Sequence, residues 1–527
     1  MNNRNEAYKL GLTGHTTRRK FNLVIAASGI LAISSEAKAQ SGVKRGGTLT
    51  VGLLLLPKSM DPLFGDAISV DNLVYEAVYD CLVKWEASGQ YGPGLAESWV
   101  YGANGRSLML KLRQGVRFHD GTPFNAAAAV INLRRLISTD VNSPRASLVE
   151  EISSVDFIDS YTIRINLITP SGALLGALAT APGMIVSPAA LEKYGKDISR
   201  NPVGTGPFKF VEWPSGGSLK LARNQDYWRT GLDGRSLPYL DGLIMRDIPN
   251  SAVKLLEVES GNIQLIDEIV PRNFSKVRQN TKMDLVKVNN GTCQWIVFNI
   301  TKAPFDNEVI RKAILFAIDR EQMVKVVAEN EGEVLPAHVT RNEWAFEGDI
   351  DIYKYNLQRS RELLAIAGKP NGFQATLTYI QRDPDTTVAQ LLKSQLMKVG
   401  IDLKLEALER QAFIAKNTSK QHEISMGGAR VPVGDPDQMF TTYFGDSAYH
   451  RGGAGLPEMF KLVDAGRQAT VQSERKKIYR KAQELLLDKA LYGWLFYRPS
   501  AYVKLKSVQN LKVNPIGTWS LEDVWLN

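Results

Sequence analysis

Two carboxylates and an arginine stand close together in the segment SMGGARVPVGDPDQMF, residues 425–440. Paired carboxylates such as Asp435 and Asp437 can perform acid–base chemistry. They lie in a stretch rich in proline and glycine, where aspartate commonly forms turns, so we interpret them as turn-forming residues. The composition is unfavourable for a helix or a central strand, and it predicts a loop that contacts a ligand.

The remaining candidate residues for catalysis do not form a known motif. His422 and Glu423 make half of the zinc motif H-E-x-x-H, but Met426 occupies the position of the second histidine. The chain has no G-x-S-x-G, Walker or G-x-G-x-x-G sequence, and GTGP at 204–207 predicts a turn. We therefore predict neither an enzyme nor a cofactor or metal site, and we keep a secreted hydrolase as a remote alternative.

Two segments with the order strand, helix, glycine, strand precede this region. In residues 375–408 a predicted helix ends at Gly400 and a strand follows. Residues 243–269 repeat the order, with a helix capped by Ser251 and ended by Gly261. Each unit returns the chain to a sheet. Because the two units lie more than 100 residues apart, we predict an α/β fold with separate lobes.

Hydrophobic periodicity predicts further elements along the chain. Predicted strands cover 48–56, 108–124 (ending in a turn), 161–167 and 208–213, and predicted helices cover 71–85, 126–137, 309–318 and 357–367.

The first 39 residues have the features of an export signal. Arg18, Arg19 and Lys20 precede an apolar stretch of 11 residues, 23–33, and then the small-residue sequence A-K-A at 37–39. The paired arginines resemble a twin-arginine signal. The apolar stretch is too short for a bilayer, which needs roughly 20 residues. We predict a signal peptide over 1–39 and no direct membrane insertion.

Charge and cysteine content exclude further classes. The formal net charge is +9, and the predicted signal peptide carries six Lys/Arg and two Asp/Glu, so +5 remains on the mature chain. Only the runs RRK at 18–20 and RKK at 475–477 are basic, so we predict no nucleic-acid partner. Cys81 and Cys293 are interpreted as unpaired buried thiols, while a disulfide between them stays open.

Seven segments in order resemble the family 5 extracellular solute-binding proteins, which deliver dipeptides, oligopeptides or nickel to ABC importers. The resemblance covers essentially the whole mature chain. These segments are GGTLTVG (46–52), SMDP (59–62), GLAESW (94–99), LRQGVRFHDGTPF (112–124), NPVGTGPFKF (201–210), FNITKAPFDNEVIRKAILFAIDR (298–320) and LMKVGIDLKLE (396–406).

The resemblance implies a periplasmic monomer with two α/β lobes that close on a ligand, and ABC permease and ATPase partners. One lobe would be discontinuous, built from 40–75, 205–288 and 496–527. An inserted domain would cover 76–204, and the other lobe 289–495.

Peptide receptors of this family hold the ligand carboxylate with an arginine and its amino group with an aspartate. Arg382 follows the predicted strand 375–380, where the resemblance places that arginine, and a guanidinium suits a planar carboxylate. The alternative role of Arg382 is a structural ion pair with Asp383 or Asp385.

The amino-group anchor does not match the family. Aligning 434–437 with the family's G-D-P-D-like stretch puts Ala429 at the aromatic position and Pro432 at the aspartate position. Arg430 is the nearest charged residue, and it favours an anionic group. We therefore predict a carboxylate-bearing solute, with a nickel or metallophore, opine-type or sugar-conjugate cargo as alternatives. The predicted ligand-binding residues are Arg382, Gly427, Gly428, Ala429, Arg430 and Asp435.

Overall fold

The computed structural model describes residues 42–65, 68–86, 88, 90–341, 343–382, 384–430, 435–445, 455–514 and 517–527. For 68–70, 289–290 and 430 it describes the backbone alone. The predicted signal peptide, Asp383, Pro432 and Gly434 lie outside the described residues.

An eleven-stranded mixed sheet runs through the described part of the chain in the order β15-β14-β16-β12-β17-β11-β1-β10-β9-β8, with β13 added beside β17. The strands are β1 (Thr48–Leu53), β8 (Phe208–Glu212), β9 (Leu219–Arg223), β10 (Gly242–Asp247), β11 (Leu265–Ile269), β12 (Met283–Phe298), β13 (Glu333–Val334), β14 (Phe373–Ile380), β15 (Ile401–Leu408), β16 (Ile424–Arg430) and β17 (Tyr492–Leu505).

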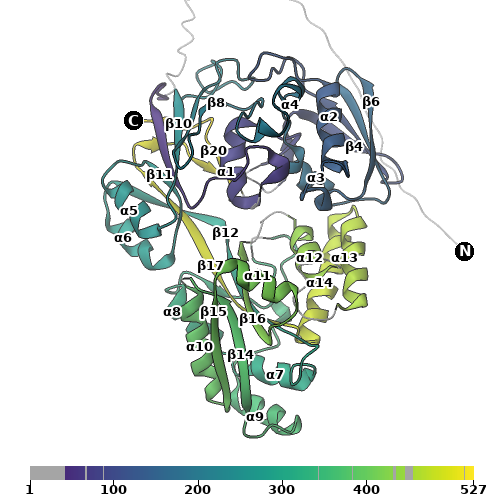
Figure 1. The fold of residues 1–527 in the computed structure, drawn as a ribbon, viewed down its shortest axis with the longest axis vertical. Coiled ribbons are helices and arrows are strands. Elements are labelled where there is room, and N and C mark those ends of the chain that lie inside the picture. The colour runs from purple at the N-terminus through teal and green to yellow at the C-terminus, as the bar shows by residue number, and fades with distance from the viewer. Residues whose placement is uncertain are drawn as a thin grey trace, which may run out of the picture. The chain divides into compact units, whose positions relative to one another are not determined.

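The long strands β12 and β17 join the two halves of this sheet. They pair with each other, β12 continues the sheet through β16, and β17 continues it through β11 (Figure 1). Their pairing is irregular between Val288 and Thr292, midway along β12. The two lobes of this α/β fold are therefore connected by a continuous pair of strands.

The lobe that contains β14, β15 and β16 has its own large hydrophobic core, which extends from Cys293 to Tyr497. Its helices are α7 (Glu308–Phe316), α8 (Arg320–Val327), α9 (Leu357–Ile366), α10 (Asp385–Met397), α11 (Arg410–Thr418), α12 (Asp437–Phe444), α13 (Pro457–Gln468) and α14 (Gln472–Asp488). We call it the C-terminal lobe.

The lobe built on β1 and β10 has a second core, which includes Leu49, Leu243 and Trp519. It contains α1 (Ile68–Val78), α5 (Ser251–Glu259) and α6 (Phe274–Gln279), and the short strands β18 (Val508–Gln509), β19 (Lys512–Val513), β20 (Trp519–Ser520) and β21 (Trp525–Leu526).

A separate four-stranded antiparallel sheet, in the order β4-β5-β7-β6, forms a third core with α2 packed on β6 and β7. We call this region the inserted domain. Its elements are β2 (Val83–Trp85), β3 (Tyr91–Pro93), β4 (Ala96–Tyr101), β5 (Ser107–Leu112), β6 (Ile152–Asp159), β7 (Thr162–Leu167), α2 (Ala126–Ile137), α3 (Leu174–Leu178) and α4 (Pro188–Tyr194).

Three local predictions are wrong. The predicted helix 71–85 ends at Val78, because the following residues are bound by distant backbone groups: Leu82 N donates to Gly183 O, and the chain then enters β2. Asn250, and not Ser251, caps α5, since its side chain accepts from the amides of residues 252 and 253. Residues 425–430 belong to an interior strand instead of a loop: all of them pair with β12, and Ser425 also pairs with β14.

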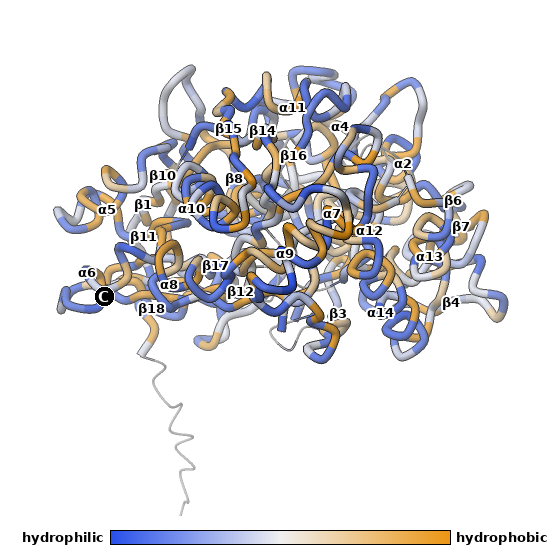
Figure 2. The backbone as a smooth tube through the Cα atoms, turned by 90° about the horizontal axis from the view of Figure 1, so that it is seen from below, coloured by the Kyte–Doolittle hydropathy of each residue, from blue (hydrophilic) through white to orange (hydrophobic). Residues whose placement is uncertain are grey.

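The predicted unpaired state of both cysteines is confirmed, as Cys81 and Cys293 are free and buried. Figure 2 shows hydrophobic and hydrophilic residues alternating closely along the helices. Among the described helices, none has the length and apolar character needed to cross a membrane.

Candidate functional site

Three parallel strands end at one edge of the sheet in the C-terminal lobe. β14 runs parallel to β15 and to β16, so the chain leaves them at the same edge, after Ile380, Leu408 and Arg430 (Figure 1). In open α/β sheets ligands bind outside the carboxyl ends of parallel strands. We call this the carboxyl edge; Arg382 follows the end of β14, and Arg430 is the last residue of β16.

Arg382 lies just beyond β14 at the carboxyl edge. Its Nε donates to Asp385 Oδ2 at 2.8 Å, and Gln294 Nε2 donates to Asp385 Oδ1 at 3.3 Å. The Asp385 side chain is only 7% exposed, whereas that of Arg382 is 48% exposed. Among the described residues, none accepts a hydrogen bond from Arg382 Nη1 or Nη2. The guanidinium is thus held by one side while its two terminal nitrogens stay open for a planar carboxylate.

The ion pair that sequence analysis gave as the alternative role of Arg382 is therefore present with Asp385. The two roles are compatible, because the ion pair uses Nε alone. The other possible partner, Asp383, lies outside the described residues.

The two glycines of β16 accommodate side chains of β12. A Cβ on Gly427 would collide with the indole Nε1 of Trp295, and a Cβ on Gly428 would lie 2.9 Å from Gln294 Oε1. Ala429 pairs with Cys293 and packs against the core. A glycine-rich segment is therefore stable here as an interior strand, since its neighbours fill the space that larger side chains would take.

Arg498 is a residue of this edge that sequence analysis missed. Thr292 on β12 pairs with Arg430 on one side and with Arg498 of β17 on the other. Arg498 is 9% exposed. Three arginines thus belong to the carboxyl edge, and Arg498 could be found only from the register of two strands distant in sequence.

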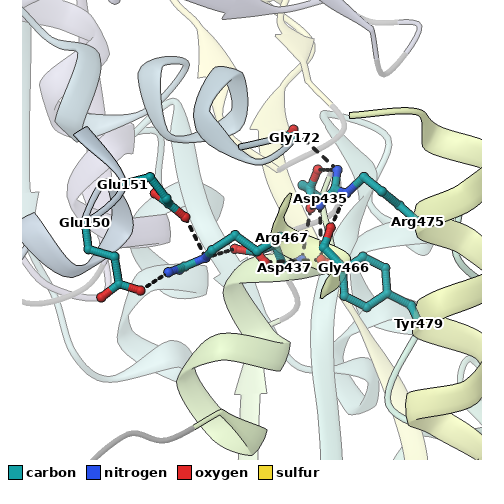
Figure 3. Close-up of polar contacts among 9 residues, drawn as sticks. All are labelled: Glu150, Glu151, Gly172, Asp435, Asp437, Gly466, Arg467, Arg475 and Tyr479. Atoms are coloured by element: carbon teal, nitrogen blue, oxygen red, sulfur yellow. Dashed lines mark hydrogen bonds and ion pairs between the residues drawn. The ribbon is translucent and has the colours of Figure 1, made fainter. Parts of the chain in front are cut away.

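Asp435 and Asp437 stand at the start of α12 (Figure 3); Asp437 is buried, and the Asp435 side chain is 11% exposed. The Asp437 amide donates to Asp435 Oδ1 at 2.9 Å, as expected for a turn. Asp435 also accepts from Arg475 Nη2 at 2.7 Å, and Asp437 accepts from the Tyr479 hydroxyl at 3.1 Å. Burial raises the pKa of Asp435, which the Arg475 guanidinium opposes. These carboxylates are occupied by partners within the lobe.

Metal-binding groups are not assembled in the part of the chain that the structure describes. Nowhere among those residues do three His, Cys, Asp or Glu side chains lie together in a way that could hold a metal ion.

Comparison with known proteins gives concordant matches. The family described as "Bacterial extracellular solute-binding proteins, family 5 Middle" matches residues 90–451. A glutathione-binding protein GsiB from Pectobacterium atrosepticum is 28% identical over 485 residues, which are 88% of this chain and 91% of that protein. The GsiB of Escherichia coli O1:K1 is 30% identical over 448 residues, covering 81% and 83%.

Solved structures are similar over nearly the full chain. The periplasmic binding protein DppA from Helicobacter pylori, in complex with the peptide STSA, has a TM-score of 0.79 at 27% identity and covers 92% of this chain and 98% of its own. AgaA from A. tumefaciens R10, in complex with agropinic acid, has a TM-score of 0.76 at 25% identity, with coverages of 91% and 99%.

Proposed function

Because the chain belongs to the bacterial extracellular solute-binding proteins of family 5, which serve ABC importers, we propose that its cargo is a small peptide-like solute that bears a carboxylate. The observation that carries this proposal is the state of Arg382. Its Nε is fixed by Asp385, its side chain is 48% exposed, and among the described residues its terminal nitrogens have no acceptor. An arginine oriented in this way is ready to bind a carboxylate through two parallel hydrogen bonds.

The relatives support the same chemistry. Glutathione, the peptide STSA and agropinic acid are the ligands named for three similar proteins, and each of these ligands carries at least one carboxylate. Arg430 and Arg498 both pair with Thr292 of β12, so the sheet carries two further arginines near the end of β16, a composition that favours an anionic solute.

Further parts of the proposal concern the whole chain. Residues 1–39 act as a twin-arginine-type signal, and the mature monomer works in the periplasm as a receptor without enzymatic activity. It passes its cargo to the permease of an ABC importer. The discontinuous lobe comprises 40–75, 205–288 and 496–527, the inserted domain 76–204, and the other lobe 289–495.

Calorimetry with glutathione, a short peptide and an opine acid tests the cargo class, and mass spectrometry of material that co-purifies with the exported protein identifies the natural ligand. The variant Arg382→Glu should abolish measurable binding of the solute that the wild type binds, and Arg430→Glu should weaken it. Arg359→Glu on the exposed side of α9 is the matched control and should bind as the wild type does. Unchanged affinity in Arg382→Glu would overturn the assignment.

A further inference from the structure

Two buried arginines of the C-terminal lobe contact the inserted domain (Figure 3). Arg467, at the end of α13, forms an ion pair through Nη1 with Glu150, which lies just before β6. Its Nε is 3.1 Å from Glu151 Oε1, without the alignment of a hydrogen bond, and 3.3 Å from Asp437 Oδ2. The Arg467 side chain is 7% exposed and that of Glu151 6%. The contacts of Arg467 with Glu151 and Asp437 are therefore shielded from water and weakly screened by salt, whereas the Glu150 side chain is 62% exposed.

Gly172 of the inserted domain meets the same helices through its backbone. Its N–H donates to Arg467 O at 2.8 Å, and its carbonyl accepts a long hydrogen bond of 3.4 Å from Arg475 Nη1. A Cβ at this position would collide with Ala469 O and would lie 3.1 Å from Arg475 Cδ. Only glycine allows the two backbones to approach this closely. We call Glu150, Glu151, Gly172, Arg467 and Arg475 the clasp.

The clasp is connected to the carboxyl edge through the first turn of α12. Arg475 holds Asp435, and Arg467 holds Asp437. Asp435 stands five positions after Arg430, the last residue of β16. The same two arginines therefore contact the inserted domain and the chain segment that leaves the carboxyl edge.

The character of this contact suits an interface that opens and closes. The hydrophobic core of the inserted domain and that of the C-terminal lobe are separate clusters, with no described residue in common. The clasp consists of polar groups. These groups regain hydration when the two domains separate, which lowers the free-energy cost of separation.

We propose that Arg467 and Arg475 are positioning residues that fasten the inserted domain onto the C-terminal lobe when cargo is bound, so that the inserted domain slows cargo release. The inference rests on the proposed function, because it assigns to the inserted domain a part in retaining the solute. Ligand that favours the closed form shifts the population toward the clasped state, and an intact clasp lengthens the time that the solute stays bound.

The variant Gly172→Ala tests the clasp selectively. The backbone of Gly172 lies outside the left-handed region, so alanine is allowed there, and the three atoms nearest to the added methyl group belong to Ala469 and Arg475 across the interface. With glutathione as the probe, stopped-flow measurements should show release at least about tenfold faster and an association rate within about twofold of the wild type, since interface changes act mainly on dissociation. Ser171→Ala, one position away, is the control and should leave both rates unchanged.

Hydrogen exchange of the residue 172 amide reports on the clasp without any ligand, because this N–H donates to Arg467 O. Gly172→Ala and Glu151→Gln should each speed its exchange by about tenfold, and the double variant should be no faster than Gly172→Ala, since both changes break one unit. Equal exchange and equal release in wild type and Gly172→Ala would overturn the clasp. A wild type that binds none of the carboxylate solutes would overturn the proposed function, while the exchange measurement would still decide on the clasp.

Discussion

Arg382 and Arg475 belong to the same lobe, but their guanidinium groups are in opposite situations. The Arg382 side chain is 48% exposed, and among the described residues its guanidinium has one hydrogen-bond partner, Asp385, through Nε. Arg475 is 5% exposed and donates to Asp435, Tyr479, Gly466 O and Gly172 O. In Arg475 every nitrogen serves the protein, whereas in Arg382 the two terminal nitrogens remain for a partner from outside.

Under the proposed function, this difference distinguishes a binding arginine from a structural one. Charge and residue type are the same, and both pair with an aspartate. The number of donors already used and the exposure of the side chain separate the two roles. Substitutions at the two sites should therefore differ in their effect on stability: Arg475 variants should lose stability as well as release cargo faster, whereas Arg382 variants should lose mainly affinity.

The largest effect is expected for Arg475→Leu. It leaves the Asp435 carboxylate buried without its cation, and breaking a buried pair in this way costs about 3–5 kcal/mol of the free energy of unfolding. Denaturant unfolding measures the loss. Arg480→Leu, a variant of a more exposed arginine on the same helix, should cost far less. Equal losses of unfolding free energy in Arg475→Leu and Arg480→Leu would show that the buried ion pair of Arg475 has no special structural role.

Arg382→Ala should weaken binding of a carboxylate solute by about 1.5–3 kcal/mol, the range for hydrogen bonds to charged groups. The free energy of unfolding should fall by less than in Arg475→Leu, because Gln294 Nε2 still donates to the Asp385 carboxylate when the arginine is removed. Asp385→Asn should weaken binding less, because it loosens the guanidinium without removing it. Calorimetry measures the affinity and denaturant unfolding the stability of the same samples. A loss of stability without a loss of affinity in Arg382→Ala would contradict the binding role of Arg382.

Glu343 extends the comparison to an acidic residue. It is 4% exposed, whereas the Asp435 side chain is 11% exposed, and it contacts no described cation. Its carboxyl accepts from Thr340 N at 2.7 Å and from Thr340 Oγ1 at 3.0 Å. Burial raises its pKa from 4.5 to about 8. The folded state thus binds the proton more tightly than the unfolded state does, and the stabilisation that this provides is lost as the pH rises through this range.

Between pH 5 and pH 8 the free energy of unfolding should fall with a contribution from Glu343 of up to ~1.4 kcal/mol per pH unit. Glu343→Gln should flatten this slope, and Glu362→Gln on exposed α9 should not. Unfolding curves at several pH values measure the difference. Parallel slopes for wild type and Glu343→Gln would show that the carboxyl does not titrate in this range.

The smallest effect is expected for Glu150→Gln. Although Glu150 pairs with buried Arg467, its own side chain is 62% exposed. Exposed ion pairs contribute at most ~1 kcal/mol, and salt screens them. Thermal unfolding at low and high ionic strength should therefore show a minor difference that disappears with salt. If wild type and Glu150→Gln still differed in thermal unfolding at high salt, the Glu150–Arg467 pair would behave as a buried ion pair.

Local patterns predicted much of the fold. The helix over 126–137 and the strand over 401–408 have the predicted bounds, because their apolar spacing and their boundary residues act within a few positions. The strand nature of 425–430 was missed, since glycine disfavours a strand unless the neighbouring strand supplies the packing, as Trp295 and Gln294 do here.

The candidate site was predictable only in part. The place of Arg382 after a strand follows from sequence, and so does its possible pairing with Asp385 three positions later. Arg498 and the clasp depend on residues that folding brings together from far apart: Arg467 and Glu150 are separated by 317 positions. No local pattern encodes such a contact, so Arg475 could not be recognised from sequence as the partner of Asp435.

The two free cysteines have a consequence for the chemistry between receptor and cargo. Burial raises the pKa of both Cys81 and Cys293 well above the usual value for a thiol. Thiol–disulfide exchange requires an accessible thiolate, and neither residue provides one. A sulfur-bearing solute, whether reduced or oxidised, is therefore not captured as a mixed disulfide, and the receptor can release it by dissociation alone.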